Sequence, residues 1–68
     1  METVDLHGVK HREVFMKLSK HCVDYNGNFI VITGNSSQMK KIVKAIVDSF
    51  GLKIRESINN PGRIIVYE

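Results

Sequence analysis

The sequence predicts a single α/β domain with the element order βαβαββ, folded as a two-layer sandwich in which two helices cover one face of a four-stranded mixed sheet. A chain of 68 residues has room for only one domain. Two stretches repeat apolar residues at helical spacing, and the other apolar stretches are short, as in strands. Strand, helix, strand connections are almost always right-handed, so two that step the same way leave both helices on one face. The other face is expected to be open.

The first strand is expected over residues 3–7. Side chains alternate along a strand, so its apolar residues face the core while Asp5 and His7 face the opposite way. Gly8 follows directly, and a residue without Cβ lets the chain turn sharply out of the strand. A carboxylate and an imidazole at a strand end beside a turn are suited to proton transfer on a bound substrate.

Two helices are predicted from apolar stripes at helical spacing. The first runs from Lys10 to about Tyr25, and Gly27 is suited to the left-handed position at its C-terminal end. The second follows Gly34-Asn35-Ser36-Ser37, where either serine can cap it, and continues until Gly51. The stripes consist of Val14, Phe15, Leu18, Cys22 and Tyr25 in the first helix and Met39, Ile42, Val43, Ile46, Val47 and Phe50 in the second.

Three further strands are expected. Residues 29–33 are continuously apolar and β-branched, which predicts a central strand largely covered on both faces. Residues 52–58 alternate between apolar and polar side chains and predict a half-buried strand with a cationic outer face. Residues 64–67 form the last strand, and the Asn-Asn-Pro-Gly turn joins these two as a hairpin. A symmetric four-residue loop would set Ile58 opposite Arg63, which suits neither, so a bulge or a longer loop is expected.

Composition indicates a small folded domain with a preference for polyanions. The hydrophobic fraction of 43% is too high for a disordered chain, and the net charge of +3 favours a nucleic-acid partner, although many basic domains bind none. One cysteine excludes an internal disulfide, and no apolar run approaches the ~20 residues of a membrane span. The first residues do not resemble a signal peptide. We therefore expect a cytoplasmic monomer with no membrane partner.

Two short motifs resemble those of the small MutS-related (Smr) domain family. Asp5-Leu6-His7-Gly8 is similar to the family's Leu-Asp-x-His motif, and Thr33-Gly34-Asn35-Ser36 is similar to its Thr/His-Gly-x-Gly motif. The resemblance covers nearly the whole chain, because the helices, the strands and the run after Pro61-Gly62 follow in the family's order. Two positions depart from the pattern: Val4 replaces a Leu, which is conservative, and Ser36 replaces the last Gly of the loop, which removes backbone freedom near a ligand.

The resemblance implies the family's fold, which is similar to the C-terminal domain of translation initiation factor three, and endonuclease activity. It implies Asp5 as the catalytic acid and His7 as the base or orienting group. A lone carboxylate holds Mg²⁺ poorly, so we favour cleavage without a cofactor, although Mg²⁺ is an alternative. His7 would take a proton from a ribose 2′-hydroxyl while Asp5 supports the imidazole. That chemistry requires RNA, with DNA nicking as the alternative.

Two groups of residues are candidate contacts to the phosphate backbone. The amides at the start of a helix are unpaired and attract phosphate, although most such caps bind nothing. A cationic strand face can pair with phosphate, although it is more often only solvated. The candidates are Gly34, Asn35, Ser36, Lys40 and Lys41 around the start of the second helix, and Lys53, Arg55 and Arg63 in the last two strands. Tyr67 can stack on a base, although a strand aromatic more often packs.

A metal site is not expected, and two other functions are alternatives to endonuclease activity. His7, His11, His21 and Cys22 do not suggest a metal site, since no four-ligand set can be assembled from neighbouring positions. A non-catalytic nucleic-acid-binding module on the same fold is the first alternative to the nuclease. The second is a protein-binding adaptor that docks on a larger protein or ribonucleoprotein partner, or dimerises through its last strand.

Overall fold

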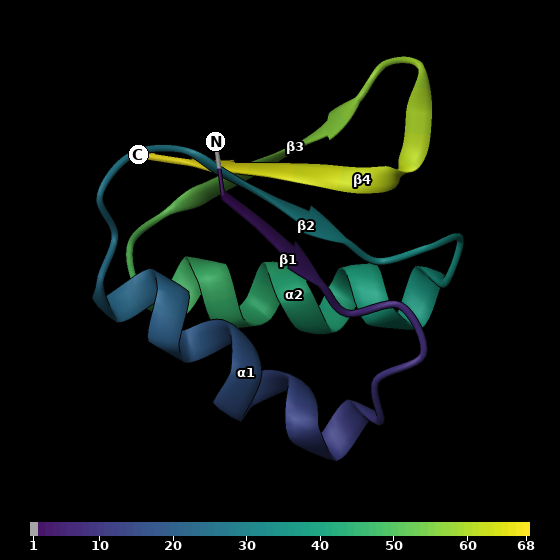
Figure 1. Ribbon diagram of the computed structural model, residues 1–68, viewed down its shortest axis with the longest axis horizontal. Helices are drawn as coiled ribbons and strands as arrows, with labels where there is room; N and C mark the ends of the chain where they lie inside the picture. Colours follow the sequence, from purple (N-terminus) through teal and green to yellow (C-terminus); the bar gives the residue numbers. More distant parts are fainter. Residues whose placement is uncertain (1) are drawn as a thin grey trace.

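The computed structural model describes residues 2–68 and confirms the predicted two-layer α/β sandwich. The elements are β1 (Glu2–Asp5), α1 (His11–Val23), β2 (Phe29–Ile32), α2 (Ser37–Ser49), β3 (Lys53–Ser57) and β4 (Asn60–Tyr67). The strand order is β1-β2-β4-β3, in which β1 is parallel to β2 and β4 is antiparallel to both of its neighbours. Both helices lie below the sheet in Figure 1, so one face of the sheet is left open.

The core lies between the sheet and the two helices. Val4 on β1, Val31 on β2 and Ile64 on β4 stand in one row across the sheet, and all three are buried. The helices complete this core with Val14, Leu18 and Cys22 from α1 and Met39, Val43, Ile46 and Val47 from α2. Neither helix, nor any other within residues 2–68, is long and apolar enough to cross a membrane.

The open face changes one expectation for β2. The strand is central, as predicted, because it lies between β1 and β4. Only its alternate residues Phe29 and Val31 are buried, however, while Ile30 and Ile32 are half-buried. The prediction that both faces of this strand are covered is therefore wrong, because no second layer of helices packs on the other side.

Helix α1 is shorter than predicted and covers less apolar surface. It ends at Val23, and Gly27 lies in the following loop, where its φ of 112° turns the chain toward β2 without capping the helix. Phe15 was expected in the core stripe, but its side chain is 57% exposed. Val14 and Leu18 are buried because they recur at the spacing of four that faces the sheet, whereas Phe15 is rotated by about 100° from Val14 on a helix of 3.6 residues per turn.

The hairpin of β3 and β4 contains the expected bulge. Glu56 pairs with Ile64, but the next residue, Ser57, pairs with Asn60, so residues 61–63 are extra on the β4 side. The turn between the strands is correspondingly short, and Ile58 at its tip is 97% exposed. Strand β4 thus begins at Asn60, earlier than predicted, because the bulged residues still reach β2, where Arg63 pairs with Ile32.

Candidate nucleic-acid site

The turn after β1, the loop after β2 and the bulge near the start of β4 meet at one end of the sheet. A Cβ built on Gly34 would lie 2.9 Å from Cδ2 of His7, and a Cβ built on Gly62 would lie 3.3 Å from Cα of Gly34. The imidazole of His7 therefore rests on the backbone of Gly34, and Gly62 packs against the same glycine. We call His7, Gly34 and Gly62 the loop cluster. The two motifs that resemble the Smr family are thus in direct contact.

Backbone hydrogen bonds hold the loop cluster together. The N–H groups of Thr33 and Gly34 both donate to the carbonyl oxygen of Gly62, at 2.8 and 3.2 Å. The buried hydroxyl of Thr33 lies 2.9 Å from the carbonyl oxygen of Gly34 and 3.3 Å from that of Gly62. Gly34 has a φ of 68°, in the left-handed region that favours glycine. Two features therefore fix the loop after β2: its hydrogen bonds to Gly62 in the bulge of β4, and the left-handed backbone conformation of Gly34.

Asp5 and His7 are both exposed, but they interact differently from the expected pair. The carboxylate Oδ1 of Asp5 accepts a hydrogen bond from the backbone N–H of His7 at 3.0 Å. His7 lies in the turn after β1, which ends at Asp5, so the prediction of a strand through residue 7 is wrong. Among residues 2–68 no hydrogen bond or ion pair joins the Asp5 carboxylate to the imidazole. Asp5 instead fixes the turn that presents His7.

The start of α2 lies next to the loop cluster. Ser36 caps the helix, because its Oγ accepts a hydrogen bond from the N–H of Met39 at 3.1 Å. Within the described chain, the N–H groups of Ser37 and Gln38 have no hydrogen-bond partner. Free amides at a helix N-terminus carry partial positive charge, so these two can donate to a phosphate oxygen.

The strand register places three predicted cations and Asp5 on the face of the sheet away from the helices. Asp5 is opposite Ile32, which is opposite Arg63, so Asp5 and Arg63 are separated by two strand spacings, or about 10 Å. Arg55 and Lys53 occupy the same face at the far edge strand. We call the residues of this surface the open face: Asp5, Ile30, Ile32, Lys53, Arg55, Arg63, Ile65 and Tyr67.

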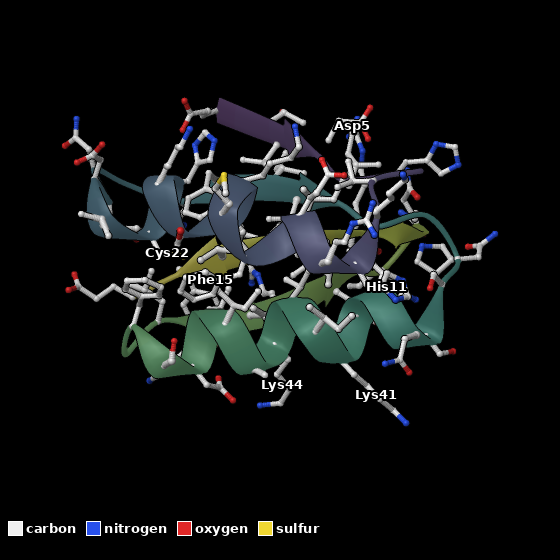
Figure 2. The ribbon with its side chains drawn as sticks, turned by 90° about the horizontal axis from the view of Figure 1, so that it is seen from below. Asp5, His11, Phe15, Cys22, Lys41 and Lys44 are labelled. Atoms are coloured by element: carbon white, nitrogen blue, oxygen red, sulfur yellow. The ribbon has the colours of Figure 1, made fainter. Side chains whose placement is uncertain are left out.

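The two lysines predicted near the start of α2 lie elsewhere. The Nζ of Lys40 is 3.4 Å from Oε1 of Glu56, an ion pair on the helix side of the sheet. Figure 2 places Asp5 and Lys41 at opposite edges of the molecule. Lys41 therefore does not lie at the loop cluster, and Lys40 forms an ion pair with Glu56.

Sequence reasoning missed Gly62, which was interpreted only as part of a turn. Its contact with Gly34 joins residues far apart in the chain, and no local pattern reveals it. One signal was present: a strand that pairs antiparallel with β2 must begin beside the point where β2 ends, and Pro61-Gly62 precedes that strand in the sequence.

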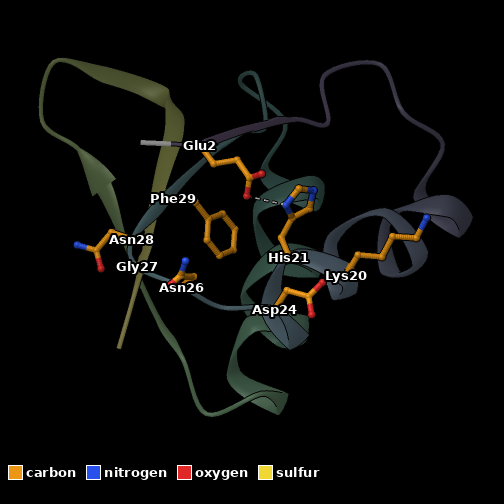
Figure 3. Close-up of a pocket in the computed structure, with 8 residues that line it drawn as sticks. All are labelled: Glu2, Lys20, His21, Asp24, Asn26, Gly27, Asn28 and Phe29. Atoms are coloured by element: carbon orange, nitrogen blue, oxygen red, sulfur yellow. Dashed lines mark hydrogen bonds and ion pairs between the residues drawn. The ribbon is translucent and has the colours of Figure 1, made fainter.

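His21 and Cys22, near the C-terminal end of α1, lie away from the loop cluster. A hollow of about 570 Å³ opens beside the end of α1, the first residue of β1 and the loop before β2 (Figure 3). There Nδ1 of His21 lies 2.9 Å from Oε1 of Glu2. Cys22 is buried, and burial raises the pKa of its thiol. In the part of the chain that the structure describes, no three His, Cys, Asp or Glu side chains are grouped to hold a metal ion.

Comparison of the chain with models of protein families, with curated proteins and with solved structures gives no match. The fold and the site define a small α/β two-layer domain with one open sheet face, in which two loops and the bulge of β4 meet at one end of the sheet. Membership of the Smr family, and similarity to the C-terminal domain of translation initiation factor three, stay predictions from the motifs.

Proposed function

We propose that this chain is a nucleic-acid endonuclease of the Smr type, that RNA is its preferred substrate, and that it acts at the loop cluster. The contact between the two motifs carries the proposal, because the imidazole of His7 rests on Gly34 although 26 intervening residues separate them. An exposed imidazole rests on the loop that leads into a helix with two free amides, which is an arrangement suited to proton transfer beside a bound phosphate.

In this reaction His7 takes the proton from a ribose 2′-hydroxyl. The 2′-oxygen attacks the adjacent phosphorus, the bond from phosphorus to the 5′-oxygen breaks, and a 2′,3′-cyclic phosphate forms. The departing 5′-oxygen receives a proton from water, and His7 returns its own proton to solvent. The amides of Ser37 and Gln38 are the groups that would stabilise the extra negative charge on the phosphate oxygens. Asp5 acts through the turn that it fixes rather than through the ring.

The test compares the wild type with His7→Ala and Asp5→Asn on single-stranded RNA, nicked duplex DNA and branched DNA. We expect His7→Ala to lower the rate of RNA cleavage by about 10²- to 10⁴-fold, the usual contribution of a general base. A 2′-deoxy substitution at the scissile position should abolish cleavage, and EDTA should leave it unchanged. Cleavage by both variants at the wild-type rate would mean a contaminating nuclease and would overturn the proposal.

A binding module that does not cleave is the second candidate. It is favoured by the hydrogen bond between Asp5 and the backbone of His7, which leaves the imidazole without a carboxylate partner among residues 2–68. It is also favoured by Ser36, whose side chain is occupied as a helix cap. Salt-dependent RNA binding with no cleavage dependent on His7 would select this candidate.

A further inference from the structure

The open face combines an apolar centre with a cationic rim. Ile30, Ile32 and Ile65 are half-buried and stand in neighbouring rows of the sheet, and no helix covers them. Tyr67 continues this surface along β4 and is also half-buried. A soluble domain rarely leaves apolar side chains on a whole sheet face without a ligand or partner to cover them.

The charges on this surface indicate the chemistry of its ligand. Lys53, Arg55 and Arg63 give it three positive charges, against the one negative charge of Asp5. The Cζ of Arg55 lies 5.8 Å from the centroid of the Tyr67 ring, so a guanidinium and a phenol form a paired platform at the edge of the apolar centre. An acidic ligand that also offers flat apolar surfaces would satisfy both features.

Single-stranded RNA has that chemistry, whereas duplex RNA does not. A single strand exposes the faces of its bases for stacking on aromatic side chains and guanidinium planes, and its phosphates remain available to Lys and Arg. In a duplex the base faces are hidden within the stack. A second copy of this chain would bring the same three cations against each other, which is unfavourable.

The open face extends along β4 toward the loop cluster. Arg63 lies opposite Ile32 at the end of β2, where Thr33 and Gly34 follow. Tyr67 is four residues further along β4, a distance of about 14 Å at the usual rise of a strand. A short run of nucleotides laid along β4 would therefore reach from the Tyr67 platform to Arg63, next to Gly62 of the loop cluster.

We propose that the open face binds a single-stranded RNA segment, with a base stacked on the Arg55–Tyr67 pair and phosphates held by Lys53 and Arg63. This inference rests on the proposed function for its choice of RNA and adds that the substrate must be unpaired beside the cleavage point. The bound RNA runs from Tyr67 across Ile65, Ile30 and Ile32 to the loop cluster.

The experiment uses the non-cleaving His7→Ala chain, so that binding is measured apart from catalysis. Fluorescence anisotropy compares a labelled mixed-sequence RNA as a single strand and as a duplex. We expect at least tenfold tighter binding of the single strand, and we expect the additional change Tyr67→Ala to weaken it by about tenfold, in line with the loss of one base–aromatic stack. Tyr67→Phe, which keeps the ring, should bind as the parent does.

A matched control removes an exposed aromatic from the other layer. Phe15→Ala changes a ring that is 57% exposed on α1, and it should leave RNA binding unchanged. Lys53→Gln and Arg63→Gln should each make the slope of log affinity against log salt less steep by about 0.7, the value for one phosphate contact with a single strand. Circular dichroism of each variant verifies that the fold is retained.

Three results would overturn the inference. They are equal affinity for single strand and duplex, unchanged binding by Tyr67→Ala, and a dimer that becomes a monomer on Tyr67→Ala, which would mean that a second copy covers the face. The proposed endonuclease activity is tested by a separate measurement. It would be contradicted if the wild type and His7→Ala cleaved RNA at the same rate. Each idea can therefore fail while the other stands.

Discussion

Gly34 is the residue on which the contact between the two motifs depends. Its φ of 68° is disfavoured for any other residue, and His7 leaves no room for a Cβ. We expect Gly34→Ala to destabilise the fold by about 1–2 kcal/mol from the left-handed backbone alone and also to displace the imidazole. Urea denaturation measures the first effect, and the NMR chemical shifts of the His7 ring report the second.

Gly51 provides the matched control for this prediction. Its φ is 77°, close to that of Gly34, but a Cβ built there would meet no atom within 4 Å. Gly51→Ala should therefore lower stability by a similar amount while the His7 resonances and RNA binding stay as in the wild type. If both variants disturbed His7 equally, the contact with Gly34 would have no special role in the site.

Helix α2 links the stability of the fold to the candidate phosphate contact, because its cap and its free amides belong to the same turn. We expect Ser36→Ala to destabilise the protein by about 0.5–2 kcal/mol, since the N–H of Met39 loses its acceptor. Ser37→Ala should have a smaller effect, because the Ser37 hydroxyl makes no capping bond. Thermal unfolding followed by circular dichroism compares the two variants.

A third substitution in the same turn tests the departure from the Smr motif. Glycine is a nearly adequate cap, so Ser36→Gly should lower stability by only a few tenths of a kcal/mol. If the serine limits the approach of phosphate to the loop, this variant should bind RNA more tightly than the wild type. Unchanged affinity would show that Ser36 acts only as a cap.

A domain of this size has little excess stability, so its few fully buried side chains contribute a large share. At about 0.05–0.15 kcal/mol per residue, a chain of 68 residues is stable by roughly 3–10 kcal/mol. We expect Leu18→Ala to cost about 2–5 kcal/mol, because Leu18 is fully buried between α1 and the sheet. Met16→Ala, on the same helix but 68% exposed, should change stability by less than about 0.5 kcal/mol. Equal urea midpoints for the two variants would contradict this description of the core.

The architecture was largely predictable because it is encoded in local periodicity. Apolar residues at helical spacing predicted the two helices, alternation or short apolar runs predicted the strands, and the unsuitable pairing of Ile58 with Arg63 predicted the bulge. The errors concern which side chains of a helix or strand are covered by neighbouring elements. Phe15 was misplaced because spacing does not reveal how narrow the buried stripe of α1 is. Ile30 was misplaced because an apolar run does not reveal whether a second layer exists.

The candidate site was predictable only in part. The motifs identified Asp5, His7 and Gly34, and the alternation of strand residues identified the face that carries Lys53 and Arg55. The sequence could not reveal that the Asp5 carboxylate would bond to the backbone of its own turn, because that depends on the path of the chain after β1. Contacts that join distant segments, such as that of Gly62 with Gly34, likewise depend on the completed sheet.

The strand order has a consequence for how the protein is made. On the ribosome β1, β2 and β3 emerge before β4, yet β4 lies between β2 and β3 and supplies the carbonyl of Gly62 that holds the loop after β2. A nascent chain that lacks β4 has neither a continuous sheet nor a fixed position for Gly34 beside His7. The candidate site is therefore completed only after translation has passed the residues of β4.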